Sequence, residues 1–379
     1  MIFWIFLAFL TMETSGQSNF DVIDKYAQSV PNSIKNDISD ITHYIIKPCT
    51  TDLEKLRAIF IWIVTHISYD KAADSGTNSI AHDLDTILRY QKTICIGYAK
   101  LLQKMCQTAG LESEIISGYC HNNPTSKNIT DSPDHAWNAV KLNDEWYLLD
   151  ATWSASLWKS KPKKKINPEV DYYFLPKAAT FLETHLPAQP LWQLVSNPID
   201  MNIFISQPDS IIYYVENSSD PYSYTDSIRA FLKLAPSLKK IKEGLSSWQF
   251  HPTEKNLNLY MAALMDRAGE LTDSLEYIQK SGPIESLLSA QRDLLELCRY
   301  TASLGNLLTW QKELYAEAII NHIVALHRSA NGRPDMELKT ELLFLLEEAR
   351  TVLRSSEETY YTRNALELLS EYQGIIGQN

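Results

Sequence analysis

The sequence predicts an α+β domain, in which a helix that begins at a cysteine packs on an antiparallel sheet, followed by an all-α domain. Apolar residues recur at helical spacing between Cys95 and Gly110. Two strand-like runs flank a two-residue turn within residues 135–150. From residue 224 onward nearly every segment has helical periodicity, and 379 residues are enough for two cores.

Composition and charge exclude several classes of protein. Apolar residues make up 45% of the chain, which is typical of a globular protein. The formal net charge of −11 argues against a nucleic-acid or anionic-membrane partner, because no basic field would attract phosphate. The cysteines are few, odd in number and without CxxC spacing, which supports neither a disulfide scaffold nor a zinc site. They are Cys49, Cys95, Cys106, Cys120 and Cys298.

The N-terminal residues resemble a secretory signal peptide. Met1–Leu10 is an apolar run too short for a comfortable membrane span, and small residues follow at Ser15, Gly16 and Ser18. No lysine or arginine precedes the run, so a membrane-associated or mis-started segment is the alternative. We expect residues 1–16 to be a signal peptide, the protein to be exported, and the mature chain to contain no transmembrane span.

One or two short N-terminal helices are expected within Asn19–Ile46, and two further helices are expected before the cysteine. Thr51 and Glu54 form a capping-box pattern ahead of a helix over Leu53–Ile67, which its apolar residues would bury on most sides. A short helix over Asp83–Tyr90 leads into the cysteine segment. We expect the helix over Leu53–Ile67 to form core.

The cysteine helix begins at or near Cys95 and ends before Gly110. Unsatisfied amides and the positive end of the helix dipole favour a thiolate there, which is the nucleophilic form of cysteine. Gly97 would let another part of the chain approach the sulfur. The alternative is a buried cysteine that acts as a small apolar residue.

The strand-like runs predict a hairpin after a strand at Glu114–Tyr119. If Asn143 and Asp144 form the turn between His135–Leu142 and Glu145–Asp150, paired positions sum to 287. His135 then faces Thr152, and Asp150 faces Trp137. Asp150 is therefore the diagonal same-face neighbour of His135, within hydrogen-bonding reach, and a one-residue slip would separate them.

The rest of the chain carries less specific signals. Lys159–Lys165 is basic and forms either a solvated loop or a substrate-steering patch. The connector at residues 194–223 has strand-like runs at Asn202–Ile205 and Ser210–Val215. The helical domain at residues 224–379 reads as antiparallel helices with short loops, either packing only or docking a protein or the cell envelope. Its expected helices are Ser227–Glu243 with a break at Pro236, Asn256–Ala268, Leu271–Gln279, Ile284–Ala302, Gln311–Ser329, Asp335–Leu353 and Ala365–Gly374.

Cys95, His135 and Asp150 supply the three groups that thiol catalysis requires: a nucleophile, a base and a group that orients the base. Each alone has a structural explanation, as a buried thiol, a core histidine or a strand-end cap. A helix start and a hairpin that bring all three together are much less easily explained by chance.

The surrounding motifs resemble the transglutaminase-like core, in the branch that contains the kyphoscoliosis-peptidase and cytokinesis-associated proteins. The resemblance covers about Leu53–Gln193, within a core domain placed at residues 17–193. The motifs are Cys95-Ile-Gly-Tyr-Ala, Ala109-Gly-Leu, Ser117-Gly-Tyr, Asp134-His-Ala-Trp-Asn, Trp146-Tyr-Leu-Leu-Asp-Ala-Thr-Trp, Ala58-Ile-Phe-Ile-Trp-Ile, Ile67-Ser-Tyr-Asp, Asp171-Tyr-Tyr-Phe and Thr184-His-Leu-Pro.

The resemblance implies a papain-like α+β fold with Cys95 as nucleophile, His135 as general base and then acid, and Asp150 as its orienter. It implies acyl transfer through a thioester that water or an amine resolves. The Cys95 amide would bind the oxyanion with one further donor, for which Gln91 is a candidate and a solvent-facing loop amide the alternative. No calcium-ligand cluster is visible, so neither a metal nor a cofactor is expected.

Two residues depart from the family pattern: Ile96 stands at a commonly polar position and Ser154 at a common glycine. Both neighbour the pocket and leave the substrate open. The expected function is an exported cysteine acyl-transfer enzyme, protease or cross-linker, acting on peptide or protein amides. The alternatives are a catalytically silent scaffold whose helical part grips a partner, and hydrolysis of a non-peptide amide or ester.

Overall fold

The computed structural model describes residues 16–74, 83–120, 129–160, 166, 168–206, 210–216 and 223–378. These residues form two compact units, Met1–Ala230 and Phe231–Asn379. The expected signal peptide lies outside the described residues except for Gly16, and so does most of the basic segment Lys159–Lys165. Among the described helices, none combines the length and apolarity that crossing a membrane requires.

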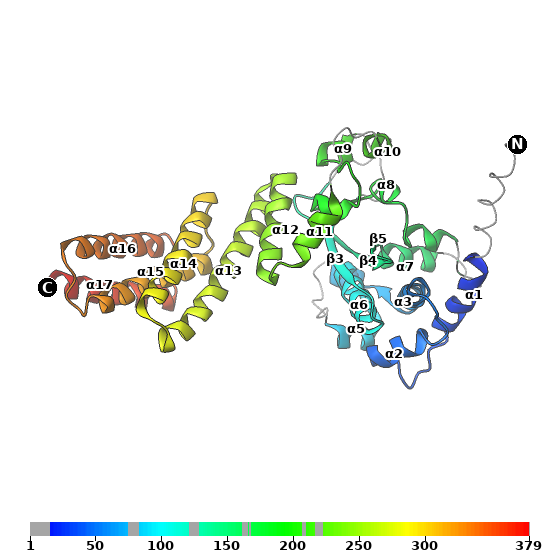
Figure 1. Ribbon diagram of the computed structural model, residues 1–379, viewed down its shortest axis with the longest axis horizontal. Helices are drawn as coiled ribbons and strands as arrows, with labels where there is room; N and C mark the ends of the chain where they lie inside the picture. Colours follow the sequence, from blue (N-terminus) through cyan, green and yellow to red (C-terminus); the bar gives the residue numbers. More distant parts are fainter. Residues whose placement is uncertain are drawn as a thin grey trace, which may run out of the picture. The chain divides into compact units, whose positions relative to one another are not determined.

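The first unit is built on a four-stranded antiparallel sheet in the order β5-β4-β3-β6, and Figure 1 labels β3, β4 and β5. A separate parallel pair joins β1 (Ser68–Tyr69) to β2 (Lys92–Thr93). Helix α6 packs against β3 and β4 and also contacts α2, α3 and α7. The strands of the larger sheet are β3 (Ser113–Cys120), β4 (His135–Leu142), β5 (Glu145–Leu149) and β6 (His185–Pro187). The helices are α1 (Gly16–Ala27), α2 (Ile38–Ile45), α3 (Asp52–His66), α4 (Lys71–Asp74), α5 (Leu84–Tyr90), α6 (Cys95–Thr108), α7 (Ala151–Ser160), η1 (Pro168–Tyr173), α8 (Ala178–Phe181), η2 (Pro190–Gln193), α9 (Met201–Ser206), α10 (Ile211–Glu216) and α11 (Tyr224–Leu232).

Helix α3 is the central core helix that the sequence predicts. Its capping box is present, with the Thr51 side chain accepting the Glu54 amide and the Glu54 carboxylate accepting the Thr51 amide. The buried guanidinium of Arg57 donates from Nε and Nη2 to the two oxygens of Asp24, each at 2.7 Å, and from Nη1 to Asp171. This ion-paired cluster ties α1 and η1 to the core.

The cysteine helix is also present as predicted, with Cys95 as its first residue and Gly110 beyond its end at φ 78°. Gly97 allows Thr93 of β2 to approach the backbone of α6 closely, as the small size of glycine suggests. A Cβ at Gly97 would lie 1.9 Å from the Thr93 hydroxyl oxygen, so only glycine lets α6 pack on β2. The start of α6 is therefore held tightly against the preceding strand.

The hairpin has the predicted register, with pairs from Asn138↔Leu149 to Leu142↔Glu145 and positive φ at both turn residues. The expected pairing of His135 with Thr152 is wrong. Strand β5 ends at Leu149 because Asp150 caps α7, its carboxylate accepting the amides of the second and third helical residues. His135 instead pairs with Gly118 on β3.

The two short strands expected in the connector are helices. Asp200 accepts the Ile203 amide at the start of α9, and buried side chains recur three or four residues apart in both helices. Burial of one helical face thus overrides the β-propensity of the isoleucines and tyrosines here. The predicted connector lies within the first compact unit.

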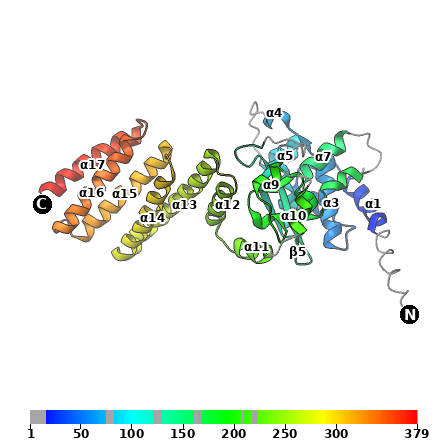
Figure 2. The same ribbon diagram turned by 90° about the horizontal axis from the view of Figure 1, so that it is seen from above.

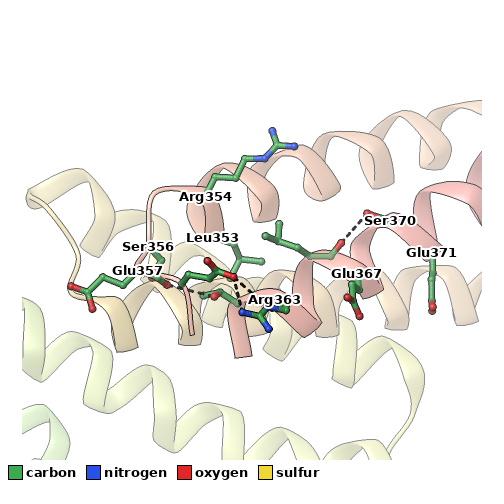
Figure 3. A pocket seen from close by; sticks show the side chains of 11 residues that line it. Leu353, Arg354, Ser356, Glu357, Arg363, Glu367, Ser370 and Glu371 are labelled. Carbon is green, nitrogen blue, oxygen red and sulfur yellow. Dashed lines mark hydrogen bonds and ion pairs between the residues drawn. The ribbon is translucent and has the colours of Figure 1, made fainter. Parts of the chain in front are cut away.

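The second unit consists of helices that pack in chain order, each against the next, as Figure 2 shows. The two helices expected on either side of Gly269 form one continuous helix, because glycine is tolerated within a helix at a modest cost. The helices are α12 (Pro236–Phe250), α13 (Glu254–Ser281), α14 (Ile284–Leu304), α15 (Thr309–Ser329), α16 (Met336–Arg354) and α17 (Tyr360–Gln378). An open groove between α16 and α17 is lined by charged side chains, including Arg354, Glu357, Arg363, Glu367 and Glu371 (Figure 3).

Candidate active site

The imidazole–carboxylate contact that the hairpin register predicts is present. His135 begins β4 and Asp150 directly follows β5, and Nε2 of His135 lies 2.8 Å from Oδ2 of Asp150. Both side chains are buried. Because Nε2 is engaged by the carboxylate, Nδ1 is the ring nitrogen left to exchange a proton with another group.

Four N–H groups converge on the Asp150 carboxylate. Oδ1 accepts the amide hydrogens of Thr152 at 2.7 Å and Trp153 at 3.1 Å, at the positive end of α7. Oδ2 lies 2.8 Å from Nε2 of His135 and 3.2 Å from Nε2 of His185. Burial alone would raise the pKa of this carboxyl, but the two imidazoles outweigh burial and hold the pKa well below its usual range. Asp150 is therefore ionised at neutral pH.

His185 is the site residue that sequence reasoning missed. It begins β6 and pairs with Cys120, and its side chain is fully buried. Its Nδ1 lies 2.8 Å from the hydroxyl oxygen of Thr184. The sequence signal was limited to the Thr-His-Leu-Pro motif, because β6 pairs with a strand far away in the chain and no local register reports it.

Aromatic rings surround the buried end of the site. The His185 ring stacks on Phe181 at 4.3 Å between centroids and lies 4.4 Å from the ring of Trp153. Trp137 and Tyr173 contact it edge-on at 5.2 and 5.4 Å. These rings exclude water from the carboxylate, which strengthens its electrostatic hold on the imidazoles.

Cys95 lies at the start of α6 and is partly exposed. No side chain caps this helix start. Burial lowers the pKa of His135, but the Asp150 carboxylate outweighs burial and the side chain of Cys95 adds to its effect, so the pKa rises to about 10. His135 is thus an imidazole that readily binds a proton, and the Cys95 thiol is among the groups that raise its pKa.

The other thiols differ from Cys95 in their surroundings. Burial raises the pKa of the partly exposed Cys49 to about 11, with Glu54 adding to the effect. Burial also raises the pKa of Cys120, and Cys95 is among the groups that act on it. Cys106 and Cys298 are buried. These four cysteines are poor nucleophiles at neutral pH and serve as internal references.

The remaining sequence candidates occupy distinct places. Gln91 is exposed, ends α5 with φ 49°, and uses its carbonyl oxygen to accept the Ser68 amide. Its role as an oxyanion donor stays a prediction. Ser154, which replaces a common glycine, is fully buried and donates its hydroxyl to the Val170 carbonyl at 2.8 Å. Through this hydrogen bond the serine at position 154 links α7 to η1.

His135, Asp150 and His185 could also approach one metal ion, since each offers a ligand atom and these atoms lie within 4.8 Å of one another. Both imidazole Nε2 atoms already lie at hydrogen-bonding distance from the same carboxylate oxygen. To bind there, a metal ion would have to replace the hydrogens that the two Nε2 atoms share with the carboxylate oxygen. The donor set fits an acid–base pair without any added group.

Comparison with known proteins agrees with this architecture. Residues 39–151 match the model of the Transglutaminase-like superfamily. Kyphoscoliosis peptidase of Homo sapiens is 37% identical over 187 residues, which are 49% of this chain and 28% of that protein. Hillarin of Drosophila melanogaster is 28% identical over 208 residues, covering 50% of this chain and 24% of the relative.

A third relative covers the same share of this chain as Hillarin does. Cytokinesis protein 3 of Schizosaccharomyces pombe (strain 972 / ATCC 24843) is 28% identical over 199 residues, or 50% of this chain and 21% of that protein. The chain therefore spans less than a third of the length of each of these curated relatives.

Proposed function

Because this chain contains a transglutaminase-like domain, we propose that it is a cysteine acyl-transfer enzyme that acts on peptide or protein amides. Cys95 is the nucleophile, His135 the base and acid, and Asp150 the residue that orients His135. The observation that carries the proposal is the buried imidazole whose Nε2 is bound to an ionised carboxylate and whose pKa the Cys95 thiol also raises.

Before the first half-reaction the Cys95 proton has already passed to Nδ1 of His135, because the pKa of this imidazole is raised to about 10, and the thiolate sulfur then attacks the amide carbonyl carbon. The C–S bond forms while the carbonyl π electrons move to oxygen. The C–N bond then breaks, and the imidazolium gives its proton to the departing amine nitrogen. A thioester at Cys95 and a free amine result.

In the second half-reaction, water or an amine attacks the thioester carbon. His135 takes the proton of the attacking group and returns it to the sulfur as the C–S bond breaks. Water yields a carboxylic acid, and an amine yields a new amide. The name of the human relative specifies a peptidase, so hydrolysis is the outcome that we propose first.

The oxyanion of both intermediates is bound by the backbone N–H of Cys95, because the first amides of a helix have no intrahelical partner. Gln91, four residues earlier, is the second donor in this proposal. Gln91 is exposed. We also propose that the protein acts outside the cytosol, since residues 1–16 resemble a signal peptide.

A catalytically silent scaffold is the second candidate. The names of two relatives, Hillarin and cytokinesis protein 3, state no enzymatic activity. The second unit exposes large apolar side chains, such as Phe344 and Tyr360, that a partner could cover. This function predicts that Cys95→Ala leaves the cellular phenotype unchanged, whereas deletion of residues 231–379 abolishes it.

Alkylation of the thiols distinguishes the two functions. The full chain is treated with iodoacetamide at pH 7, and each cysteine peptide is quantified over time by mass spectrometry. The enzyme function predicts that Cys95 reacts faster than the reference Cys49, which is also partly exposed, and that His135→Ala slows Cys95 while Cys49 keeps its rate. Equal, slow labelling of both thiols in the unaltered protein would contradict it.

A further inference from the structure

The Asp150 carboxylate has a second imidazole partner beyond the one that the proposed function uses. Nε2 of His185 lies 3.2 Å from Oδ2, the same oxygen that binds His135. A carboxylate oxygen without a proton only accepts hydrogen bonds, so Nε2 of His185 must carry a hydrogen. His185 therefore donates to the carboxylate from β6, a strand outside the hairpin.

Thr184 selects this tautomer of His185. Its hydroxyl oxygen lies 2.8 Å from Nδ1, which accepts the hydroxyl hydrogen when the ring proton is on Nε2. A neutral ring thus satisfies both of its nitrogens, and a chain of polar groups runs from Thr184 through His185 to the carboxylate.

His185 cannot act on a substrate directly. Its side chain has no solvent exposure and is enclosed by the rings of Phe181, Trp153, Trp137 and Tyr173. Glycine at position 118 lets β6 approach β3, because a Cβ there would lie 2.3 Å from the Leu186 carbonyl oxygen. The ring therefore has a defined place, and only Asp150 transmits its effect to the reacting groups.

We propose that His185 is a positioning residue, which fixes the Asp150 carboxylate so that His135 presents Nδ1 to the Cys95 thiol. The inference rests on the proposed function. Two backbone amides hold Oδ1, but with a single imidazole on Oδ2 the carboxylate is free to tilt about that anchored edge. The second imidazole opposes this tilt, in the way that outer hydrogen bonds orient catalytic ligands and rings.

The experiment compares the Cys95 alkylation rate by iodoacetamide in variants of the full chain across pH 5 to 11. His185→Leu removes the donor and keeps an apolar side chain among the rings. His185→Gln and His185→Asn form a matched pair of amides, because the glutamine nitrogen reaches the Nε2 position and the asparagine nitrogen does not. The titratable groups that face His185 are Asp150 after β5, His135 on β4 and Tyr173 in η1.

We expect Cys95 to react about tenfold more slowly at pH 7 in His185→Leu and His185→Asn, and His185→Gln to stay within about threefold of the unaltered protein. The step in the Cys95 rate at high pH, where His135 loses its proton and leaves a free thiolate, should move to higher pH in His185→Leu, because a carboxylate with one donor fewer attracts the imidazolium more strongly. Cys49 should react alike in all variants.

Two results overturn the inference in distinguishable ways. If the His185 variants keep the rate and pH profile of the unaltered protein while His135→Ala loses them, His185 only fills space and the proposed function stands. If His135→Ala itself leaves Cys95 unchanged, the proposed function fails and His185 has nothing to position. Should His185→Leu not fold, the Gln and Asn pair decides the question alone.

Discussion

Replacing Asp150 with asparagine tests the acid–base pair most directly, because it removes one charge and almost no volume. An asparagine carbonyl oxygen can still accept the amides of Thr152 and Trp153 at the start of α7. Its NH2 group would then face Nε2 of both His135 and His185, which now donate to an oxygen. Donors cannot pair with donors, so each ring must turn or carry its hydrogen on Nδ1.

A hydrogen on Nδ1 prevents neutral His135 from accepting the Cys95 proton. In the Ser-His-Asp enzymes the equivalent substitution lowers turnover about 10⁴-fold through the wrong tautomer. Iodoacetamide reports only the thiolate, and an ordinary thiol with a pKa of about 8.5 is roughly 3% ionised at pH 7. We therefore expect Cys95 to be alkylated up to about 30-fold more slowly in Asp150→Asn.

The assay follows the Cys95 peptide by mass spectrometry under pseudo-first-order conditions from pH 5 to 10. Asp335→Asn is the matched control, because Asp335 caps α16 in the second unit by accepting the Leu338 amide at 2.9 Å. It should leave the Cys95 rate unchanged. An unchanged rate in natively folded Asp150→Asn would refute the reasoning that the carboxylate sets the state of His135.

Three further predictions concern stability. Burial lowers the pKa of His135, but Asp150 outweighs burial and raises this pKa to about 10. The pairing therefore contributes its full stability below about pH 6.5, the pKa of an unpaired histidine, and loses it as the pH rises toward 10. Urea unfolding from pH 6 to 10 measures this loss. Arg57→Leu strands the buried Asp24 carboxylate and should lower the free energy of unfolding by about 3–5 kcal/mol, measured in urea. Gly118→Ala forces β6 off β3 and should lower it by about 1–3 kcal/mol by the same measurement.

Each stability prediction has a control and a contrary outcome. His135→Gln lacks the titrating ring, and an equal pH dependence in this variant would show that other groups cause the loss. Lys55→Leu breaks only the exposed pair with Asp52 and should cost less than about 1 kcal/mol. Gly269→Ala meets no atom within 4 Å and should stabilise α13 by about 0.5–1 kcal/mol. Equal effects of Arg57→Leu and Lys55→Leu would contradict the argument from the buried ion pair. Equal effects of Gly118→Ala and Gly269→Ala would contradict the argument from close packing of β6 on β3.

The hydrogen bond between His135 and Asp150 was predictable because a two-residue turn sets the register of a hairpin over a few residues. The helix at Cys95 was predictable for a similar reason, since its period and Gly110 are local signals. The end of β5 was missed because Asp150 prefers the cap of α7 to another sheet pair. Asp150 could either extend β5 or cap α7. The strand pattern and the helix pattern, each considered alone, did not show which of the two would form.

His185 was not predictable from spacing, because its place depends on β6 pairing with β3 across the intervening elements. The prediction of two strands in the connector was wrong for a different reason. Met201 and Phe204, like Ile211 and Val215, are buried on one helical face, and this tertiary burial outweighs the strand preference of the same residues. Local patterns therefore specified the positions of Cys95, His135 and Asp150, while long-range packing supplied the second imidazole, His185.

The cost of burying charge bears on the choice between enzyme and scaffold. Asp150 is ionised with no solvent exposure, and its partner His135 is nearly as buried. A buried ion pair usually contributes little net stability, and apolar side chains of similar volume often serve a core equally well. A scaffold has no need for two imidazoles on one carboxylate next to a helix that starts with a thiol. Acyl transfer does need a proton acceptor held in one orientation, so the stability argument and the chemical argument favour the same function.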